Sequence, residues 1–430
     1  MKKNMLSSFL LVTVLFCSCR KQSQDSIQGP AGIKTSFAMK TLSSGDSTSL
    51  LGWNLIFNDE FSTGSTFDNT KWGYCPRATS DWAKYLTSSI SYVNVSNNNL
   101  QLNMDNAVIS GDTTKYHSGG IQSSGKFSFT YGKIQVRAKF TQGQGSWPAI
   151  WMLPQTSTYG GWPNSGEIDL MEHLNNDNIV YLTLHGQSLS SGSAYTTGFT
   201  ASQYNTYGIE WFPNALTFYV NNTIVGTYSR SASGGSAQWP FSIPFYLILN
   251  QSGGGSWGGP ITNSALPFNM GVDYVRVYQP DTSVVSGGVY NISTSLNNTS
   301  SLDLYNGVAQ NGTNVILYQK TGGTNQEWTF TGLGNGYYKI IPVNGTSLAL
   351  SVPGNVSTSG TQLQLNTYTG ATGQEWKITN LGNGLFGLLP ACATSSNMDV
   401  SGASITNGTK IVINPSSSVI DQQFILRRVQ

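Results

Sequence analysis

The sequence predicts an all-β protein in which a β-sandwich or barrel is followed by a β-trefoil. Within residues 51–280, short runs rich in β-branched and aromatic residues recur, and in several of them apolar and polar residues alternate, most plainly in KIQVRAKF (133–140). Hardly any segment has a helical period of useful length. Residues 288–430 carry an internal threefold repeat, which is the sequence pattern of a trefoil. We expect residues 281–287 to link the two domains.

The first residues predict export from a bacterial cell. Lys2 and Lys3 precede an apolar segment that is too short to span a membrane and has the length of a signal peptide. The segment ends in FCSC (16–19), which resembles a bacterial lipoprotein box with Cys19 as the lipidated residue. Residues 20–50 are rich in Ser, Gln and Thr and predict a disordered tether. The sequence therefore predicts a secreted protein, or an outer-membrane lipoprotein held at the cell surface by a lipid anchor alone.

Charge and cysteine content limit what the protein can bind and how it is stabilised. The 430 residues carry a formal net charge of +2, and only 10% of them are charged, so no basic stripe for nucleic acid exists. Apart from the two cysteines of the expected signal peptide, the chain has Cys75 and Cys392, which predict free thiols and no disulfide framework. We expect a monomer without a catalytic cofactor.

Three carboxylates are clustered in GEIDLMEH (166–173), within an otherwise apolar run. On a regular strand Glu167 and Asp169 would share one face, and Glu172 would point to the other. A β-bulge at Leu170 and Met171 would return Glu172 to the face of the other two acids. Paired carboxylates on a buried strand are costly unless used, and glycoside cleavage requires such a pair. The segment therefore predicts a glycosidase site more strongly than a solvated acidic face.

The same segment, read as ExDxxE, resembles the bulged, laminarinase-like branch of glycoside hydrolase family 16. Supporting segments follow in the family's order: NDEF (58–61), GQGSWPAIWMLP (143–154), YGIEW (207–211), PFYLILN (244–250) and VDYVRVY (272–278). The resemblance implies a β-jelly-roll with an open cleft and a retaining mechanism. It also implies that Glu167 is the nucleophile, that Glu172 is the general acid/base, and that Asp169 tunes the pair.

Further site residues are expected around these acids. Trp147 and Trp162 are expected to stack on sugar rings in the cleft, whereas Trp151 is either a cleft residue or core. His185 either hydrogen-bonds near the central subsite or is a structural histidine, and His173 should face away from Glu172.

Two expectations concern segments farther from the acids. The family resemblance implies a structural calcium held by Asp273 with backbone oxygens near Glu60, because oxygen ligands suit Ca²⁺. The segment NQSGGGSWG (250–258) departs from the corresponding laminarinase sequence, and we expect it to form a loop bordering the cleft.

The repeat is defined by Gln326-Glu-Trp328, Gln374-Glu-Trp376 and Gln422-Gln-Phe424, each 48 residues after the last. These QxW motifs resemble those of ricin-type lectins, or carbohydrate-binding module family 13, and are interpreted as trefoil core. The resemblance implies one sugar site per repeat, built from an Asp, an aromatic residue and an Asn. The first repeat supplies all three, as Asp303, Tyr318 and Asn325.

The other repeats depart from this pattern. The second has Ala349 in place of the Asp and Gly373 before the Gln, and the third keeps Asp399 but lacks the aromatic residue. The sequence therefore favours sugar binding in the first repeat only.

Together these features predict an endo-acting β-glycan hydrolase with a C-terminal carbohydrate-binding module. The expected substrate is a β-1,3-glucan or a mixed-linkage β-1,3/1,4-glucan. Two alternatives stay open: an endo-β-galactanase of the agarase type within the same family, and a carbohydrate-binding protein without activity. The intact acid trio disfavours the latter.

Overall fold

The computed structural model describes residues 48–189 and 193–430. The expected signal peptide and Cys19, and nearly all of the expected tether, lie outside these residues. Within them, no helix is long and apolar enough to cross a membrane.

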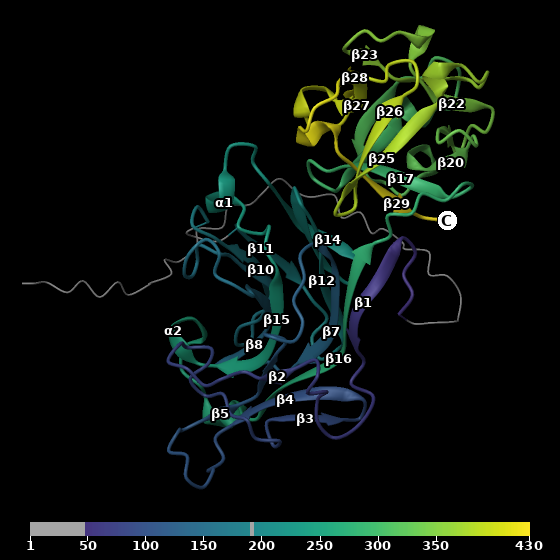
Figure 1. The fold of residues 1–430 in the computed structure, drawn as a ribbon. Helices are drawn as coiled ribbons and strands as arrows, with labels where there is room; N and C mark the ends of the chain where they lie inside the picture. Colours follow the sequence, from purple (N-terminus) through teal and green to yellow (C-terminus); the bar gives the residue numbers. More distant parts are fainter. Residues whose placement is uncertain (1–47, 190–192) are drawn as a thin grey trace, which may run out of the picture. The chain divides into compact units, whose positions relative to one another are not determined.

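The N-terminal domain is a sandwich of two antiparallel sheets (Figure 1). The first sheet follows the order β14 (Thr223–Ser229), β13 (Ala215–Val220), β12 (Asn205–Phe212), β7 (Gly132–Phe140), β16 (Phe268–Pro280), β4 (Asn99–Asp105) and β3 (Val93–Ser96). Two further strands join it: β1 (Trp53–Asp59) pairs with β16, and β5 (His117–Ser118) pairs with β4.

The second sheet carries the acidic segment. Its order is β11 (Ser193–Gly198), β10 (Ile179–His185), β9 (Glu167–Glu172), β8 (Ser146–Pro154), β15 (Phe245–Gly253), β6 (Gly120–Gln122) and β2 (Gly73–Tyr74). The long pair β8–β15 joins segments far apart in the sequence, as does β7–β16 in the first sheet. Such non-local pairing is expected of a jelly-roll sandwich.

The predicted alternation is confirmed on β7. Ile134, Val136 and Ala138 are fully buried between the sheets, whereas Arg137 and Lys139 point away from the core. Burial of each large apolar side chain contributes about 1.5–3 kcal/mol, so the sandwich derives its stability from this inner layer.

Helices are short, as the sequence predicts. The described residues contain two single-turn α-helices, α1 (Gly235–Gln238) and α2 (Gly255–Gly258), and short 3₁₀ turns. The 3₁₀ turns are η1 (Asn263–Ala265), η2 (Tyr305–Gly307), η3 (Thr324–Gln326), η4 (Pro353–Asn355), η5 (Thr372–Gln374), η6 (Ser401–Ala403) and η7 (Ile420–Gln422).

The C-terminal domain consists of short strands in three similar units. They are β17 (Val289–Thr294), β18 (Ser300–Leu304), β19 (Val315–Gln319), β20 (Trp328–Gly332), β21 (Tyr338–Pro342), β22 (Leu348–Ser351), β23 (Thr361–Gln362), β24 (Gln364–Thr367), β25 (Trp376–Gly382), β26 (Leu385–Pro390), β27 (Ser396–Val400), β28 (Thr409–Pro415) and β29 (Phe424–Arg428). They enclose a single apolar cluster, as expected of a trefoil.

The QxW motifs occupy this core. Trp328, Trp376 and Phe424 are fully buried. The Gln326 and Gln374 side chains each accept a hydrogen bond from the backbone N–H five residues earlier, at 2.7 and 2.8 Å, and donate to the carbonyl seven residues earlier, at 2.9 Å in both cases. Gln422 makes the same two bonds, at 2.8 and 3.0 Å. The interpretation of these residues as structural is therefore confirmed.

The cysteines also follow expectation. Cys75 and Cys392 are free, with Cys75 buried in the first domain and Cys392 partly exposed in the second.

Candidate active site

The acids lie on β9, between β8 and β10, and the strand is bulged where predicted. On the β8 side, Glu172 is paired with Ala149 and Asp169 with Trp151, so β9 carries one more residue than its partner over this interval. On the β10 side the register also shifts between the pairs formed by Glu172 and Asp169, so that Leu182 alone stands opposite two residues. Those two residues are Leu170 and Met171.

The bulge decides which side chains meet. Ile168, Leu170 and Met171 are all fully buried in the core between the sheets. Because the two bulge residues point the same way, the alternation restarts beyond them. Glu167, Asp169 and Glu172 therefore share the opposite face of the sheet.

This face forms the floor of a cavity of about 550 Å³ that contains both glutamates. Its size lies within the range of ligand-binding clefts. The lining residues are Ser80, Trp82, Trp147, Ala149, Trp151, Leu153, Pro154, Ser157, Trp162, Ser165, Gly166, Glu167, Glu172, Tyr246 and Asn250.

Glu167 is held by two neighbours. Trp162 donates its indole N–H to Oε2 at 2.7 Å, and His185 Nε2 lies 3.6 Å from Oε1. Burial, followed by the negative charge of Asp169, raises the pKa of Glu167 well above its ordinary value, while His185 and the Trp162 N–H act in the opposite direction. Glu167 can therefore exchange a proton at a higher pH than an exposed glutamate.

Asp169 is almost completely buried and bonds to His185, whose Nε2 lies 2.9 Å from Oδ2. His185 thus lies between Asp169 and Glu167, and its contact with the central subsite stays a prediction. The three side chains offer ligand atoms within 4.8 Å of one another and could hold a cation. A cation there would occupy the carboxylate expected to react with substrate.

Glu172 has an indole partner of its own. Trp147 donates its N–H to Oε1 at 3.0 Å. The Trp147 ring packs edge-on against Trp257 of α2, at 5.4 Å between ring centroids, and Tyr181 contacts the same Trp257 at 5.4 Å. Trp257, held by Tyr181, therefore fixes the orientation of the Trp147 indole that contacts Glu172.

Trp147 and Trp162 both line the cavity, and Trp162 is 64% exposed, as expected of a side chain open to a ligand. Trp151 also lines it but is only 6% exposed, and its N–H donates to Asn250 at 2.7 Å. It serves as both core and cavity wall. His173 packs against Phe140 on the far side of the strand from Glu172, as predicted.

The segment 250–258 is only partly the loop that the sequence predicts. Residues 250–253 continue β15 and pair with β8 up to Gly253 opposite Ser146, and α2 follows. Gly253 permits this pairing because a Cβ atom there would lie 2.7 Å from the Gly145 carbonyl oxygen. Asn250 borders the cavity, and Trp257 contacts Trp147, so the segment does adjoin the site.

Several lining residues were not predicted as site residues, among them Trp82, Tyr246 and Asn250, although Asn250 begins the segment that was expected to border the cleft. Tyr246 and Asn250 lie in the segment PFYLILN, where an apolar strand pattern masks their exposure to the cavity. Trp82 comes from a segment without periodicity, and none of the residues next to it in the sequence indicates a ligand.

The side chains at the expected calcium site have cationic partners. The Asp273 carboxylate is paired with the guanidinium of Arg137. Both oxygens of Glu60 bond to Arg276, at 2.8 and 2.7 Å. Cationic partners thus occupy both carboxylates, and calcium binding stays a prediction from resemblance alone.

The three residues expected in the first trefoil site come together. Asn325 and Gln326 donate to the two oxygens of Asp303, each at 2.7 Å. Tyr318 pairs across the strands with Ser301, two positions before Asp303, and is 39% exposed. The repeat thus holds a buried carboxylate, fixed by Asn325 and Gln326, near an exposed aromatic ring.

The other repeats lack the full set of residues, but the second differs from the prediction in one position: Ser351, and not Ala349, occupies the place of Asp303, because each of these residues lies 23 positions before the Gln of its repeat. Gln374 donates to the Ser351 hydroxyl at 3.1 Å, so the second repeat has a hydroxyl where the first has a carboxylate. Asp399 receives Gln422 at 2.9 Å, but no aromatic residue occupies the place of Tyr318.

Comparison with known proteins agrees with this architecture. The model for glycosyl hydrolases family 16 matches residues 81–275. The model for the ricin-type β-trefoil lectin domain-like family matches residues 324–414. A β-glucanase from Rhodothermus marinus is 32% identical over 247 residues, covering 53% of this chain and 85% of its own length. The chain belongs to glycosyl hydrolase family 16.

Other family members extend the comparison. A keratan-sulfate endo-1,4-beta-galactosidase from Sphingobacterium multivorum is 48% identical over 278 residues, which are 63% of this chain and 66% of that protein. Glucan endo-1,3-beta-glucosidase A1 from Niallia circulans is 37% identical, over 54% of this chain and 38% of its own length. The X-ray structure of the laminarinase from Rhodothermus marinus covers 54% of this chain and all of its own, with 31% identity and a TM-score of 0.51.

Proposed function

We propose that the protein is an endo-acting, retaining hydrolase of a neutral β-glycan, with β-1,3-glucan or mixed-linkage β-1,3/1,4-glucan as its substrate. The observation that carries the proposal is the bulged strand, which directs two glutamates into one cavity beside exposed indoles. Membership of a glycoside hydrolase family that includes glucanases supports it.

The mechanism follows from the two carboxylates. The Glu167 carboxylate attacks the anomeric carbon while the glycosidic C–O bond breaks, and Glu172 gives its proton to the departing oxygen. Glu172, now ionised, takes a proton from a water molecule whose oxygen attacks the same carbon and releases Glu167. The product keeps the β configuration.

The neighbours prepare this pair for the reaction. The Trp162 N–H stabilises the charge that Glu167 must carry before attack. Asp169 opposes that ionisation, and its bond to His185 keeps its own carboxylate fixed beneath the cavity. Trp147 orients Glu172.

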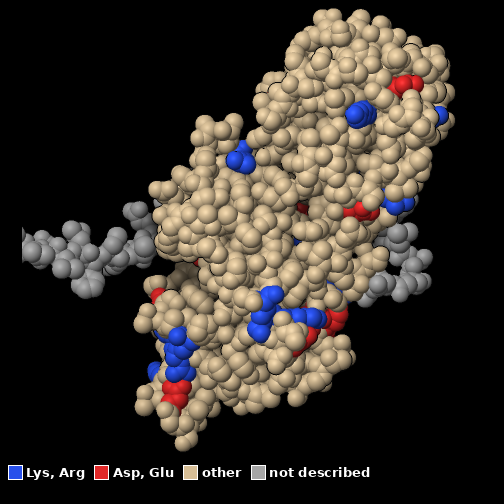
Figure 2. Space-filling view, viewed as in Figure 1, with Lys and Arg blue, Asp and Glu red and all other residues tan. Residues whose placement is uncertain are grey.

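The substrate is proposed to be neutral because none of the residues that line the cavity is Lys or Arg. Figure 2 shows that charged side chains are few on the face in view. A sulfate group in such a cavity would lose its hydration without gaining a cationic partner.

A second candidate is hydrolysis of a β-1,4-galactosidic linkage. It is favoured by the 48% identity to a keratan-sulfate endo-1,4-beta-galactosidase, which exceeds the identity to the glucanases described above.

The test is release of reducing ends from laminarin, barley β-glucan, agarose, and sulfated and desulfated keratan. Release from the glucans supports the main proposal, and release from keratan alone supports the second candidate. Without release from any of them, the hydrolase proposal fails.

The trefoil is proposed to hold the enzyme on its glycan through the first repeat. Support comes from the ordered Asp303 carboxylate and the exposed Tyr318 ring, which suit the hydroxyls and the apolar face of a sugar. Binding to insoluble glycan should persist when the acids are inactivated by Glu167→Gln and Glu172→Gln.

Export and lipidation at Cys19 are likewise proposed from the sequence. Growth of expressing cells with radiolabelled palmitate tests them: a labelled wild type and an unlabelled Cys19→Ser variant are expected. A wild type that stays unlabelled would contradict lipidation.

A further inference from the structure

Trp82 lies in the same cavity as the two glutamates but comes from a distant segment, residues 77–86, here called the cleft wall. Its ring packs edge-on against Trp151, with ring centroids 4.8 Å apart and planes at 84°. Trp151 is buried and its N–H is engaged by Asn250, whereas Trp82 is only partly buried. Trp82 therefore offers the accessible aromatic surface of this pair.

The cleft wall is fastened beside the 250–258 segment. The Asp81 carboxylate accepts the backbone N–H of Ser256 at 2.7 Å, and the Ser252 hydroxyl donates to the carbonyl of Trp82 at 2.5 Å. Ala83 and Leu86 are buried with Trp151 in a small apolar cluster. The backbone around Trp82 is thus tied to the 250–258 segment, whose Asn250 lines the cavity.

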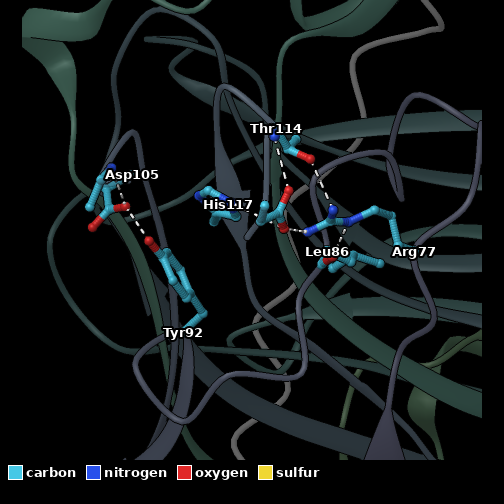
Figure 3. Close-up of polar contacts among 8 residues, drawn as sticks. Arg77, Leu86, Tyr92, Asp105, Thr114 and His117 are labelled. Atoms are coloured by element: carbon cyan, nitrogen blue, oxygen red, sulfur yellow. Dashed lines mark hydrogen bonds and ion pairs between the residues drawn. The ribbon is translucent and has the colours of Figure 1, made fainter. Parts of the chain in front are cut away.

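A polar cluster fastens the other end of the wall (Figure 3). Arg77 donates from Nε to the Leu86 carbonyl at 2.7 Å, which ties the first residues of the wall to its last. The same guanidinium pairs with Asp112 at 2.6 Å and bonds to Thr114 at 2.9 Å. Asp112 also lies 3.3 Å from the buried ring of His117. Arg77 therefore joins the wall to the 105–117 segment without touching the cavity.

The chemistry around Trp82 is apolar. Its neighbours in the cavity lining include Trp151, Ala149, Leu153 and Tyr246, and the charged residues of the whole lining are the two glutamates. A partly exposed indole flanked by apolar side chains matches the C–H face of a pyranose ring, while a charged substituent would be desolvated without compensation.

We propose that Trp82 forms a sugar-binding subsite for an uncharged pyranose unit of the glycan chain, and that the Arg77–Asp112 pair is a positioning device for it. The inference rests on the proposed function, because it presumes that the cavity holds a glycan. Trp82 would make binding depend on the length and the charge of the glycan chain, while the acids on β9 carry out the reaction.

The first test measures kcat and KM for neutral oligosaccharides of two to six units, prepared from the polysaccharide that the wild type hydrolyses. Trp82→Ala should lower kcat/KM about ten-fold or more for the longer oligosaccharides, and less for the shortest, with most of the loss in KM. Trp82→Phe should recover most of the lost kcat/KM. Arg77→Met should raise KM with little change in kcat, since it displaces the wall without altering the acids.

Tyr85→Ala is the matched control. Tyr85 lies on the same wall but packs against Tyr116, outside the cavity lining. Its removal should leave the dependence of kcat/KM on chain length unchanged. Melting temperatures of all variants identify any loss that is due to unfolding.

A binding measurement separates failure of the inference from failure of the proposed function. In a Glu167→Gln background, laminarihexaose and a hexasaccharide from desulfated keratan are titrated by calorimetry with and without Trp82→Ala. Weaker binding with the substitution supports the subsite, even if the wild type hydrolyses none of the glycans. Equal affinity overturns it, and a 6-sulfated keratan hexasaccharide bound as tightly as its desulfated form overturns the requirement for an uncharged unit.

Discussion

Trp162→Phe tests how the cleft controls the ionisation of Glu167. The substitution keeps an aromatic ring beside the cavity but removes the indole N–H that donates to Glu167 at 2.7 Å. That bond favours the ionised carboxylate, against burial and the charge of Asp169, so its loss should raise the pKa of Glu167 further.

The magnitude follows from the bond and its exposure. A hydrogen bond to a charged group contributes about 1.5–3 kcal/mol. Because Trp162 is 64% exposed, water can replace part of the lost donor, and we take the lower end of that range. About 1.4 kcal/mol corresponds to a ten-fold change in the acid dissociation constant of Glu167. On the acid side of the pH profile kcat/KM follows the ionised fraction of Glu167, so it should fall about ten-fold there and much less at the plateau.

The assay is the pH dependence of kcat/KM on a soluble oligosaccharide. The acid limb of the Trp162→Phe profile should lie at higher pH than that of the wild type. Trp147→Phe is the matched control, because Trp147 contacts Glu172 instead and its loss should leave that limb in place. An acid limb that stays fixed in Trp162→Phe, or moves to lower pH, would refute the reasoning.

Three further predictions concern single side chains. Glu172→Gln should lower activity on glycans about 10²–10⁴-fold. Azide should restore turnover of a dinitrophenyl glycoside and give the β-glycosyl azide, because azide attacks the glycosyl-enzyme without a general base. An α-glycosyl azide would refute the assignment. Glu167→Gln should melt at a higher temperature than the wild type at pH 7. The raised pKa of Glu167 means that the folded wild type loses stability as pH rises above the ordinary glutamate value, so this advantage should vanish near pH 4; a lower melting temperature at pH 7 would contradict it. Asp303→Ala should weaken co-sedimentation with insoluble glycan more than Asp399→Ala does, since only the first repeat pairs its carboxylate with an exposed aromatic ring; equal losses would argue against a single site.

Sequence predicts well those features of the fold that depend on a regular spacing of residues along the chain. Alternation in β7 indicates a strand with one buried face, and the out-of-phase Glu172 indicates a bulge at Leu170 and Met171. Both depend on residues within a few positions of one another, where the period of two leaves little freedom. The equal spacing of Gln326, Gln374 and Gln422 likewise predicts their equivalent places in the trefoil core.

The parts that sequence does not predict depend on contacts between distant segments. Trp82 reaches the cavity because the cleft wall packs between the 105–117 and 250–258 segments, and no local pattern of residues 77–86 encodes either contact. Residues 250–258 look like a glycine-rich loop, but residues 250–253 continue β15, and Gly253 is needed for close approach to Gly145 as β15 pairs with β8. The ion pair between Arg137 and Asp273 is a further contact between distant segments that no local pattern predicts.

The most direct test of the account is the configuration of the first product. Proton NMR during the first minutes of hydrolysis distinguishes the α and β anomers of the new reducing end before they equilibrate. Two glutamates brought to one face of β9 by the bulge, acting as nucleophile and acid/base, predict that the β anomer appears first. Initial appearance of the α anomer would contradict the retaining mechanism and the role given to Glu167.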